Sequence, residues 1–581
     1  MTTQLAAGAA GEDTAYDADV FVVGLGPTGL TMAHLLAARG LTVTVLEREP
    51  ESYGMARAVY TDDECLRILQ HAGVADEVHA DMIVDLPVQW VKADGSLLAQ
   101  FREPKRPHGW PVSNFFYQPF LENVLERRLA ERPEVTVRRG RSVTRFVQDA
   151  CGVTVTHVAS RGAGYGKADL SLDAATPEHI RARYLVACDG GRSTVRTSLG
   201  IDMAGTRFPQ RWLVIDLQAN EGTQPFAHLP YFDFVCDPQL PTVSCPQPDR
   251  RHRFEFMLKD SDTTEDFEER ATADRLLSRY VEVTDVTITR QLVYTFNALV
   301  ADRWRSDRVF LAGDAAHMTP QFIGQGMNAG IRDAENLSWK LADVVLRGAS
   351  DTLLDTYESE RKPHAQAMIR LSVLNKDIVS TGRPAAIRAR DWSIGAATRV
   401  PGLRSYLGEA KFKPKPRYRP GTYAGMPRRW RGMRGVEGTL MPQIPLRSMA
   451  GRPVRLDDEL GQGWAVLGVG VDPRTVLGAP VWDSLAPVWS RVFPMGGRPS
   501  GRGSRGPTPG GLVDVDASSD ALARWLRLAG ADIGSVIVLR PDRHVFSVTA
   551  PGHHADAETA LAQLFSSPSK RDARCLLGVS P

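Results

Sequence analysis

Three glycines at a fixed spacing form the most specific functional motif in this sequence. Gly24, Gly26 and Gly29 follow an apolar run at 20–23 and lead into an apolar, helix-forming stretch at 28–39. In such a turn the first glycine permits the bend, the second lets the backbone approach a pyrophosphate, and the third lets helix and strand pack closely. The amides that begin the helix then face the anion. The spacing therefore predicts a dinucleotide-binding site.

A second strand and a terminal acid complete this unit. Residues 41–46 are apolar and β-branched, and Glu47 and Arg48 follow them. A carboxylate at this place binds ribose hydroxyls. Pro27 and Thr28 lie inside the turn, beside the glycines. Because strand, turn, helix, strand and acid occur in this order, we expect all of these residues to contact the nucleotide.

A second small-residue turn lies far downstream. An apolar run at 309–312 leads into a Gly-Asp pair, and a glycine-rich segment follows. A carboxylate at a strand end can hold a polyol such as a ribityl chain, and small residues let backbone amides approach a flat ring. The segment therefore favours FAD over NAD, with predicted contacts from Gly313, Asp314, Pro320, Gly324, Gly326, Met327 and Asn328.

These segments together resemble the class A FAD-dependent aromatic hydroxylases. The match is carried by 24–29, by Cys-Asp-Gly-Gly-Arg-Ser at 188–193, and by Gly-Asp-Ala-Ala-His at 313–317. In that family the Asp-Gly pair, here Asp189 and Gly190, borders FAD and the nicotinamide cofactor. A similarity to the 3-(3-hydroxyphenyl)propionate hydroxylase subgroup is carried by residues 215–216, 253–257, 293–294, 297–298, 324–326 and 353–357.

The resemblance implies an NAD(P)H- and oxygen-dependent FAD monooxygenase. NADPH or NADH would bind transiently and reduce FAD, and a flavin hydroperoxide would then hydroxylate a phenolic or polycyclic aromatic substrate. No second glycine-rich nucleotide unit is evident, which agrees with a transiently bound nicotinamide. Two alternatives stay open, because one fold hosts several chemistries. One is a Baeyer–Villiger or epoxidising enzyme acting on a polyketide or antibiotic intermediate, and the other is a non-catalytic, ligand-sequestering flavoprotein.

The candidate catalytic residue lies in the segment 56–64. By its position Asp62 resembles an acid that deprotonates or orients a phenol, but an acid there can equally cap a helix. Arg57 resembles the arginine that reaches the FAD pyrophosphate, and its alternative role is a surface ion pair. Gln118 resembles a glutamine on the adenosine or pyrophosphate side of FAD, and its alternative role is a contact at a helix N-terminus.

Composition divides the rest of the chain. Residues 205–299 are rich in aromatic and β-branched types, as expected of a sheet, and Trp212, Tyr231, Phe254 and Phe256 are candidates for an aromatic substrate pocket. Such residues more often fill a sheet core.

The predicted fold class is α/β: a Rossmann-like FAD-binding domain, an interleaved β-sheet substrate domain and a thioredoxin-like C-terminal domain. The expected bounds are a flexible tail at 1–15, FAD-binding parts at 16–204 and 300–410 with a substrate-domain excursion near 86–113, the substrate domain at 205–299, and the C-terminal domain at 421–581.

Charge and cysteine content restrict the partners. The chain has 70 Lys and Arg residues against 68 Asp and Glu residues, which gives no long-range field for nucleic acid or an anionic membrane. The apolar stretch at 20–38 is interrupted by glycines and proline, unlike a regular bilayer span. The six cysteines form neither a CxxC pair nor a metal-ligand cluster, so dithiol chemistry is excluded and reduced thiols in a cytoplasmic protein are expected. The C-terminal domain is a candidate surface for homo-oligomerisation.

Overall fold

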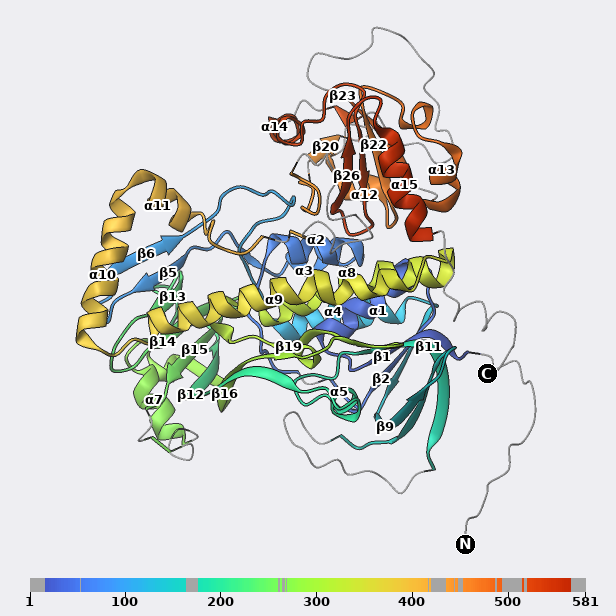
Figure 1. The fold of residues 1–581 in the computed structure, drawn as a ribbon. Coiled ribbons are helices and arrows are strands. Elements are labelled where there is room, and N and C mark those ends of the chain that lie inside the picture. Colours follow the sequence, from blue (N-terminus) through green and yellow to red (C-terminus); the bar gives the residue numbers. More distant parts are fainter. Residues whose placement is uncertain are drawn as a thin grey trace.

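Two large sheets and a smaller C-terminal sheet build the protein (Figure 1). The structure is a computed structural model. It describes residues 16–565 except 53, 163–175, 260–261, 264–266, 268, 416, 419–434, 444, 448–452, 486–487, 494–514 and 517–519. The predicted tail at 1–15 therefore lies outside the described residues.

The first sheet has eight strands, and its centre is parallel. The order is β17-β18-β11-β1-β2-β8, with β10 and β9 added beside β11. Val20, Phe21 and Val22 are fully buried, as expected where helices cover a parallel strand. The bounds are β1 (Ala18–Val23), β2 (Val43–Glu47), β8 (Val135–Arg139), β9 (Arg141–Gln148), β10 (Val153–Ala159), β11 (Glu178–Ala187), β17 (Arg305–Ser306) and β18 (Val309–Leu311).

Helices pack on this sheet and order its loops. The glycine turn leads directly into α1, and α8 ends at Gly348, whose φ of 68° is the left-handed cap that glycine adopts readily. Arg39, just after α1, donates to Glu335 of α8 at 3.0 Å and joins the two helices. The bounds are α1 (Pro27–Ala38), α2 (Asp63–His71), α3 (Ala75–His79), α4 (Gln118–Ala130), α5 (Thr194–Ser198), α8 (Gly326–Arg347) and α9 (Thr352–Val379).

The second sheet also has eight strands, in the order β19-β16-β12-β15-β14-β13-β5-β6. One face packs against α7 (Arg270–Leu277) through an apolar core. The strands β5 and β6 come from the N-terminal third of the chain and pair at the far edge. The bounds are β5 (Val88–Val91), β6 (Leu97–Phe101), β12 (Met203–Ala219), β13 (Phe232–Val235), β14 (Thr242–Gln247), β15 (Arg251–Met257), β16 (Val286–Ala301) and β19 (His317–Met318).

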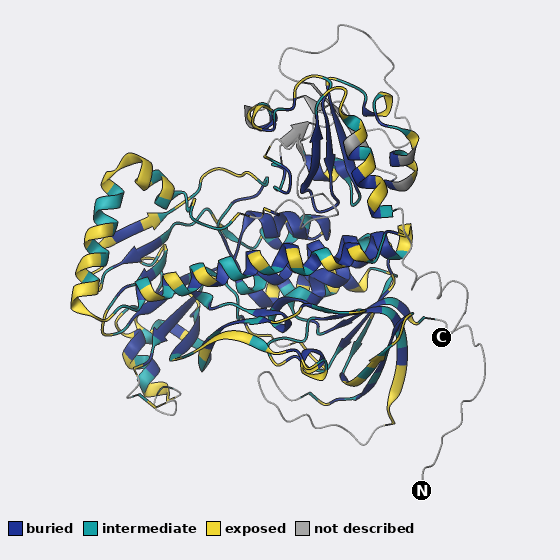
Figure 2. Cartoon of the chain, in the orientation of Figure 1, coloured by how far each residue is buried: buried dark blue, intermediate teal, exposed yellow. Residues whose placement is uncertain are grey.

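The C-terminal part has a five-stranded mixed sheet of the thioredoxin-like class, ordered β24-β23-β22-β25-β26. Two exposed helices, α10 (Pro384–Arg399) and α11 (Pro401–Gly408), precede it, and Figure 2 shows their largely exposed surfaces. The bounds are β22 (Ala465–Val469), β23 (Val488–Phe493), β24 (Val515–Asp516), β25 (Val536–Leu539), β26 (Val545–Thr549), α12 (Leu456–Leu460), α13 (Ala479–Leu485), α14 (Asp520–Leu528) and α15 (His554–Phe565). Small two- and three-stranded sheets contain β3 (Tyr60–Thr61), β4 (Ile83–Val84), β7 (Asn114–Phe115), β20 (Pro445–Arg447) and β21 (Pro453–Arg455).

Buried ion pairs fix this C-terminal part onto the helices of the first sheet. Arg67 of α2 donates to both oxygens of Asp457, at 2.5 and 2.8 Å. Arg540 donates to both oxygens of Glu360 in α9, each at 2.9 Å. Since all four side chains are buried, the contact is a permanent part of the fold.

Two expectations about the whole chain can be compared with the structure. No helix in the described part combines the length and apolar character needed to cross a bilayer. Cys65, Cys188, Cys236 and Cys245 are free thiols. Cys151 is disulfide-bonded, so the expectation of uniformly reduced cysteines is wrong at that residue.

Candidate functional site

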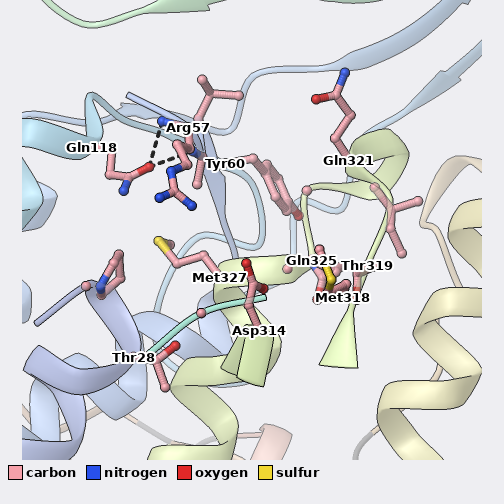
Figure 3. A pocket seen from close by; sticks show the side chains of 18 of the residues that line it. Thr28, Arg57, Tyr60, Gln118, Asp314, Met318, Thr319, Gln321, Gln325 and Met327 are labelled. Atoms are coloured by element: carbon pink, nitrogen blue, oxygen red, sulfur yellow. Dashed lines mark hydrogen bonds between the residues drawn. The ribbon is translucent and has the colours of Figure 1, made fainter. Parts of the chain in front are cut away.

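One continuous cavity of about 910 Å³ extends from the glycine turn to the second sheet. Its first half is lined by the turn, the ends of β1 and β2, and the start of α8. Its second half is lined by aromatic and aliphatic side chains of the second sheet and of the segment that follows α11. Figure 3 labels ten of its side chains, with Thr28, Asp314 and Met327 in one region and Gln321 in another.

The glycine turn has the geometry that its spacing predicts. Gly24 has a φ of 99°, which favours glycine. A Cβ on Gly29 would lie 2.0 Å from the Gly24 carbonyl oxygen, so only glycine permits this packing of helix and strand. A Cβ on Gly26 would meet nothing within 4 Å, and Gly26 lines the cavity. The turn thus leaves open space beside the N-terminus of α1, where Pro27 and Thr28 also line the cavity.

Glu47 connects the turn to the end of β2. Its Oε2 accepts a hydrogen bond from the Leu25 amide at 2.7 Å, and its Oε1 accepts one from the Glu49 amide at 2.9 Å. Glu47 and the neighbouring Arg48 both line the cavity. The carboxylate is therefore held in place by the backbone at the position where ribose binding is predicted.

Arg57 lies across the cavity from the turn, on a loop held by Gln118. The Gln118 Oε1 accepts hydrogen bonds from the amides of Arg57 and Ala58, at 2.8 and 2.6 Å (Figure 3). The Gln118 Nε2 donates to Glu122, one turn along α4, at 2.7 Å. Gln118 and Arg57 both line the cavity, and the amide shapes the loop that presents the guanidinium.

The same loop is anchored to the second sheet by Arg253. This buried guanidinium pairs with Asp216, with Nε 2.6 Å from Oδ1, and donates to the carbonyl oxygens of Ala56 at 2.5 Å and Arg57 at 2.6 Å. Arg290, from β16, also donates to the Ala56 carbonyl oxygen. The loop position of Arg57 therefore depends on strands more than 150 residues away in sequence, at β12, β15 and β16.

Asp189 supplies an unsatisfied acceptor beside the turn. Its Oδ2 accepts from the Val195 amide at 3.2 Å, while its buried Oδ1 has no hydrogen-bond partner among the described residues. Burial raises the pKa of this carboxyl. Gly190 follows with a φ of 81°, and both residues line the cavity. This oxygen can therefore accept a hydrogen bond from a hydroxyl of a bound cofactor.

The Gly313–Asp314 turn is shaped by a buried carboxylate. Asp333 Oδ2 accepts from the Gly313 amide at 3.1 Å and lies 2.7 Å from His317 Nε2. Gly313 has a φ of 59°, and a Cβ on it would lie 2.7 Å from Thr28 Oγ1. Asp314 reaches the cavity, whereas Gly313 and His317 do not line it. His317 is therefore structural.

The start of α8 forms the floor beside this turn. Gly324 has a φ of 60°, and Gly324, Gly326 and Met327 line the cavity. The predicted contacts Pro320 and Asn328 do not line it. Asn328 Nδ2 donates to the Gly324 carbonyl oxygen at 2.7 Å, and the Pro320 carbonyl oxygen accepts from Ser372 at 2.6 Å. Both residues thus support the loop from behind, and their direct contact with the cofactor stays a prediction.

The surroundings of Asp62 favour its alternative role as a helix cap over the predicted direct catalytic role, because Asp62 does not line the cavity. Asp62 caps α2, accepting from the Cys65 amide at 3.1 Å, and its Oδ2 lies 2.6 Å from both Arg332 Nη2 and Lys413 Nζ. Burial would raise the pKa of Asp62, but the two cations outweigh it and hold the pKa well below its usual value. The wall of the cavity here is formed by Tyr60, Gln325 and Lys413 instead. Asp62 is therefore a helix cap and ion-pair partner behind that wall, as the alternative interpretation proposed.

The four predicted substrate-pocket aromatics do not line the cavity. Phe254 and Phe256 lie on the opposite face of the second sheet, against α7, and Trp212 packs edge-on against Phe322. Tyr231 is 38% exposed and precedes β13. The correction follows from strand alternation: on β15 the aromatic side chains face the α7 core, so Glu255 between them faces the cavity.

Other aromatic residues form the walls instead. Phe232 stacks on Phe115 with ring centroids 5.3 Å apart, and Trp90 packs edge-on against Phe101 at 4.8 Å. The wall is completed by Phe234, Leu292, Phe296, Phe322, Leu371, Leu374, Ile378, Leu407 and Phe412. These side chains give this half aromatic and aliphatic surfaces, which suit an aromatic ring.

Three polar residues in this half were missed by the sequence analysis. Tyr294 Oη donates to Gln321 Oε1 at 3.2 Å, and Gln321 Nε2 donates to Glu255 Oε2. Burial raises the pKa of Glu255 to about 7. The sequence signal that could have identified Glu255 is the alternation of charged and aromatic residues along β15. Such alternation indicates that the two faces of the strand meet different surroundings.

The first half of the cavity fits FAD. This half is lined by the open space at Gly26, the backbone-held Glu47, the guanidinium of Arg57 and Asp189, whose Oδ1 has no partner among the described residues. They offer, in order, room and amides for a pyrophosphate, an acceptor for ribose, a cation for phosphate and an acceptor for a polyol hydroxyl. The small residues of 324–326 leave backbone amides accessible to a flat ring.

Comparisons with known proteins agree with this geometry. Residues 17–372 match the family model described as FAD binding domain, and residues 438–564 match the HcaD C-terminal domain. The chain is 35% identical to a 3-(3-hydroxy-phenyl)propionate/3-hydroxycinnamic acid hydroxylase from Burkholderia cenocepacia, covering 95% of this chain and 98% of that protein. A protein of the same name from a Mycobacterium species is 37% identical over 94% of this chain and 91% of its own length. The structure also resembles the flavin-dependent monooxygenase PieE solved with FAD and substrate, with a TM-score of 0.74 and 22% identity over 95% of this chain and 100% of that one.

Proposed function

Because this chain belongs to the FAD-dependent aromatic hydroxylases, in the subgroup that contains the 3-(3-hydroxyphenyl)propionate hydroxylases, we propose that its substrate is a single-ring phenol with an acidic side chain. The reaction uses oxygen and NAD(P)H and adds one hydroxyl group to the ring. The names of the relatives describe such substrates for those proteins.

The continuity of the cavity is the observation that carries this proposal. The cradle that fits FAD opens directly into the aromatic-walled half, with no wall between them. Arg290 and Lys413 line the second half but are paired with Asp216 and Asp62. The exposed Arg102 lies at the same cavity and is a cation that a substrate carboxylate can reach. Aromatic walls together with polar and charged side chains suit a ring that carries polar substituents.

The protein's own residues perform three tasks in this scheme. Bound FAD, once reduced, supplies the electrons and the oxygen activation. The walls built on Phe115, Phe232 and Phe296 exclude water from the reacting atoms. Tyr294, Gln321 and Glu255 offer the hydrogen-bonding groups that orient the phenol. Asp62 acts indirectly, by fixing Lys413 and the start of α2.

Product analysis tests the function. FAD-loaded protein is mixed with NADPH or NADH, 18O-labelled oxygen and 3-(3-hydroxyphenyl)propionate, with a reaction lacking the phenol as the control. We expect phenol-stimulated consumption of the nicotinamide and a product that carries one labelled oxygen atom. Nicotinamide consumption that yields only hydrogen peroxide across a panel of phenols contradicts the proposal.

Location and assembly form a second part of the proposal. The absence of nucleic-acid or membrane partners is supported by the balanced charge of the chain. A cytoplasmic location is supported by the free thiols of Cys65, Cys188, Cys236 and Cys245. Homo-oligomerisation through the C-terminal domain is supported by the exposed apolar side chains of Leu528 and Ile533. Size-exclusion chromatography with light scattering, on the wild type and on Leu528→Glu, checks the assembly: a monomeric wild type contradicts it.

A further inference from the structure

A chain of three hydrogen-bonding side chains crosses the second half of the cavity. Glu255 projects from β15, Gln321 begins the short helix η3 (Gln321–Ile323), and Tyr294 projects from β16. All three line the cavity. Figure 3 shows Gln321 on the other side of the pocket from Arg57 and Gln118, away from the residues that fit the phosphates.

The chemistry of Glu255 determines the direction of this chain. An ionised carboxylate only accepts hydrogen bonds, so it takes the Nε2 of Gln321 as its donor. The Gln321 Oε1 must then face Tyr294, and the Tyr294 hydroxyl donates to it at 3.2 Å. With its proton directed to Gln321, Tyr294 presents only an acceptor to the cavity.

We propose that Glu255, through Gln321, sets Tyr294 as an acceptor that selects a substrate hydroxyl over the corresponding ether. The proposal rests on the proposed function and adds to it the residues that determine specificity. A phenol hydroxyl supplies the donor that Tyr294 lacks. An ether at the same place supplies no donor to the lone pair of the Tyr294 oxygen, so the hydrogen bond that a hydroxyl would make is lost in a water-poor site.

The selection must depend on pH. Burial raises the pKa of Glu255 to about 7, so the carboxyl gains its proton just below neutrality. A protonated Glu255 donates, Gln321 turns its Oε1 toward it, and the Gln321 Nε2 then donates to Tyr294. Tyr294 keeps its proton but turns it toward the cavity, so the preference for a hydroxyl over an ether falls. The preference is therefore present above about pH 7 and lost below it.

The groups around Glu255 act on this change together. They are Arg253 on the same strand, Asp216 on β12, Cys245 on β14, and Arg290 and Tyr294 on β16. Arg253 and Arg290 favour the ionised carboxylate, whereas Asp216 opposes it. Of these groups, Arg253 is already paired with Asp216.

Ligand binding to the oxidised, FAD-loaded protein tests the proposal without turnover. The shift of the flavin absorption spectrum is titrated with 3-(3-hydroxyphenyl)propionate and with 3-(3-methoxyphenyl)propionate, and the ratio of the two Kd values is compared. At about pH 8 we expect a wild-type preference for the hydroxyl compound of about tenfold, the size of one hydrogen bond. The preference should fall toward onefold at about pH 6.

Variants separate the members of the chain. Tyr294→Phe and Gln321→Leu should bring the ratio near one at both pH values, and Glu255→Gln should make it independent of pH. Tyr280→Phe, at a half-buried tyrosine packed against Phe254 on the α7 side of the sheet, is the matched control and should keep the wild-type ratio. A Tyr294→Phe ratio equal to the wild type, or a wild-type ratio unaffected by pH, overturns the proposal. If either of these two results is found and the wild type still hydroxylates the phenol, the proposed function holds and only the selection by Tyr294 is wrong.

Discussion

Lys413 Nζ lies 2.6 Å from Asp62 Oδ2, although the two residues are 351 positions apart in the chain. The pair joins the segment after α11 to the first turn of α2. Arg332 of α8 binds the same oxygen at 2.6 Å, so one carboxylate holds three parts of the chain together beside the cavity. Lys413 itself lines the cavity, which makes this cluster part of the wall.

Removing the charge of Asp62 should destabilise the protein. Asp62→Asn keeps a capping oxygen for α2 but leaves two cations without their shared carboxylate. We expect the free energy of unfolding to fall by about 3 kcal/mol, as for a broken buried pair. Urea denaturation of the FAD-loaded protein measures it. Asp76→Asn, at the exposed Arg455 ion pair, is the control and should change stability very little. Equal effects of the two variants would contradict the role of the cluster.

The same carboxylate gives a pH dependence with a defined sign. Its folded-state pKa is held well below the usual value near 3.8. Its stabilising contribution is therefore present above about pH 3.8 and is lost as the pH falls through the lowered folded-state pKa. Acid unfolding curves of the wild type and Asp62→Asn should converge at low pH. Parallel curves over the whole range would show that Asp62 does not titrate in this way.

The two glycines of the first turn should respond differently to alanine. Gly26→Ala has free space for its Cβ, so the apo protein should fold normally, while the methyl group obstructs the approach of a pyrophosphate. Gly29→Ala places its Cβ 2.0 Å from the Gly24 carbonyl oxygen and should prevent the strand and helix from packing. Circular dichroism of the apo proteins and FAD titration distinguish the two effects. A Gly26→Ala protein with unchanged FAD affinity would contradict the placement of the phosphates.

Arg57 should determine how tightly FAD is held. Arg57→Ala removes a guanidinium from the cavity wall, and a charge-assisted bond to phosphate is worth about 2 kcal/mol, or about thirtyfold in Kd. Equilibrium dialysis of FAD checks this value. Arg145→Ala, an exposed arginine of β9 outside the cavity, is the matched control. The assignment fails if both variants retain FAD like the wild type.

His71 should make the attachment of the C-terminal part sensitive to pH. Its Nδ1 lies 3.0 Å from Glu335 and its Nε2 lies 3.1 Å from Asp457. Burial alone would lower the pKa of His71, but the two carboxylates raise it above 6.5. Its contribution is fully present below about pH 6.5 and is lost as the pH rises through the raised folded-state pKa. His71→Gln should flatten the decline in unfolding free energy over that range, whereas His179→Gln on the exposed end of β11 should not. A wild-type stability that rises with pH there contradicts the prediction.

The nucleotide half of the site was predictable because its determinants are local. The turn at 24–29, its flanking strands and Glu47 all lie within thirty residues, and each glycine has a steric reason that the sequence spacing encodes. The cap at Asp62 was equally local, and the structure has it.

The substrate half could not be predicted in the same way. A strand with alternating aromatic and polar residues places the aromatics in the larger apolar core, and in β15 that core is under α7 rather than in the cavity. Which face borders the cavity depends on α7 and on β5 and β6, which are distant in sequence. The ion pairs of Asp62 with Arg332 and Lys413 could not be predicted either, because both partners are distant from Asp62 in sequence.

The hydrogen bonds of the Arg253 guanidinium have a consequence for protein redesign. By bonding both Asp216 and the carbonyl oxygens of Ala56 and Arg57, the guanidinium joins the second sheet to the loop that carries Arg57. A sheet transplanted from another hydroxylase to change the accepted ring would bring its own side chains to this junction. A chimera that lacks the arginine–aspartate pair would lose the prosthetic group before its new selectivity could be observed, so both residues belong to the recipient scaffold.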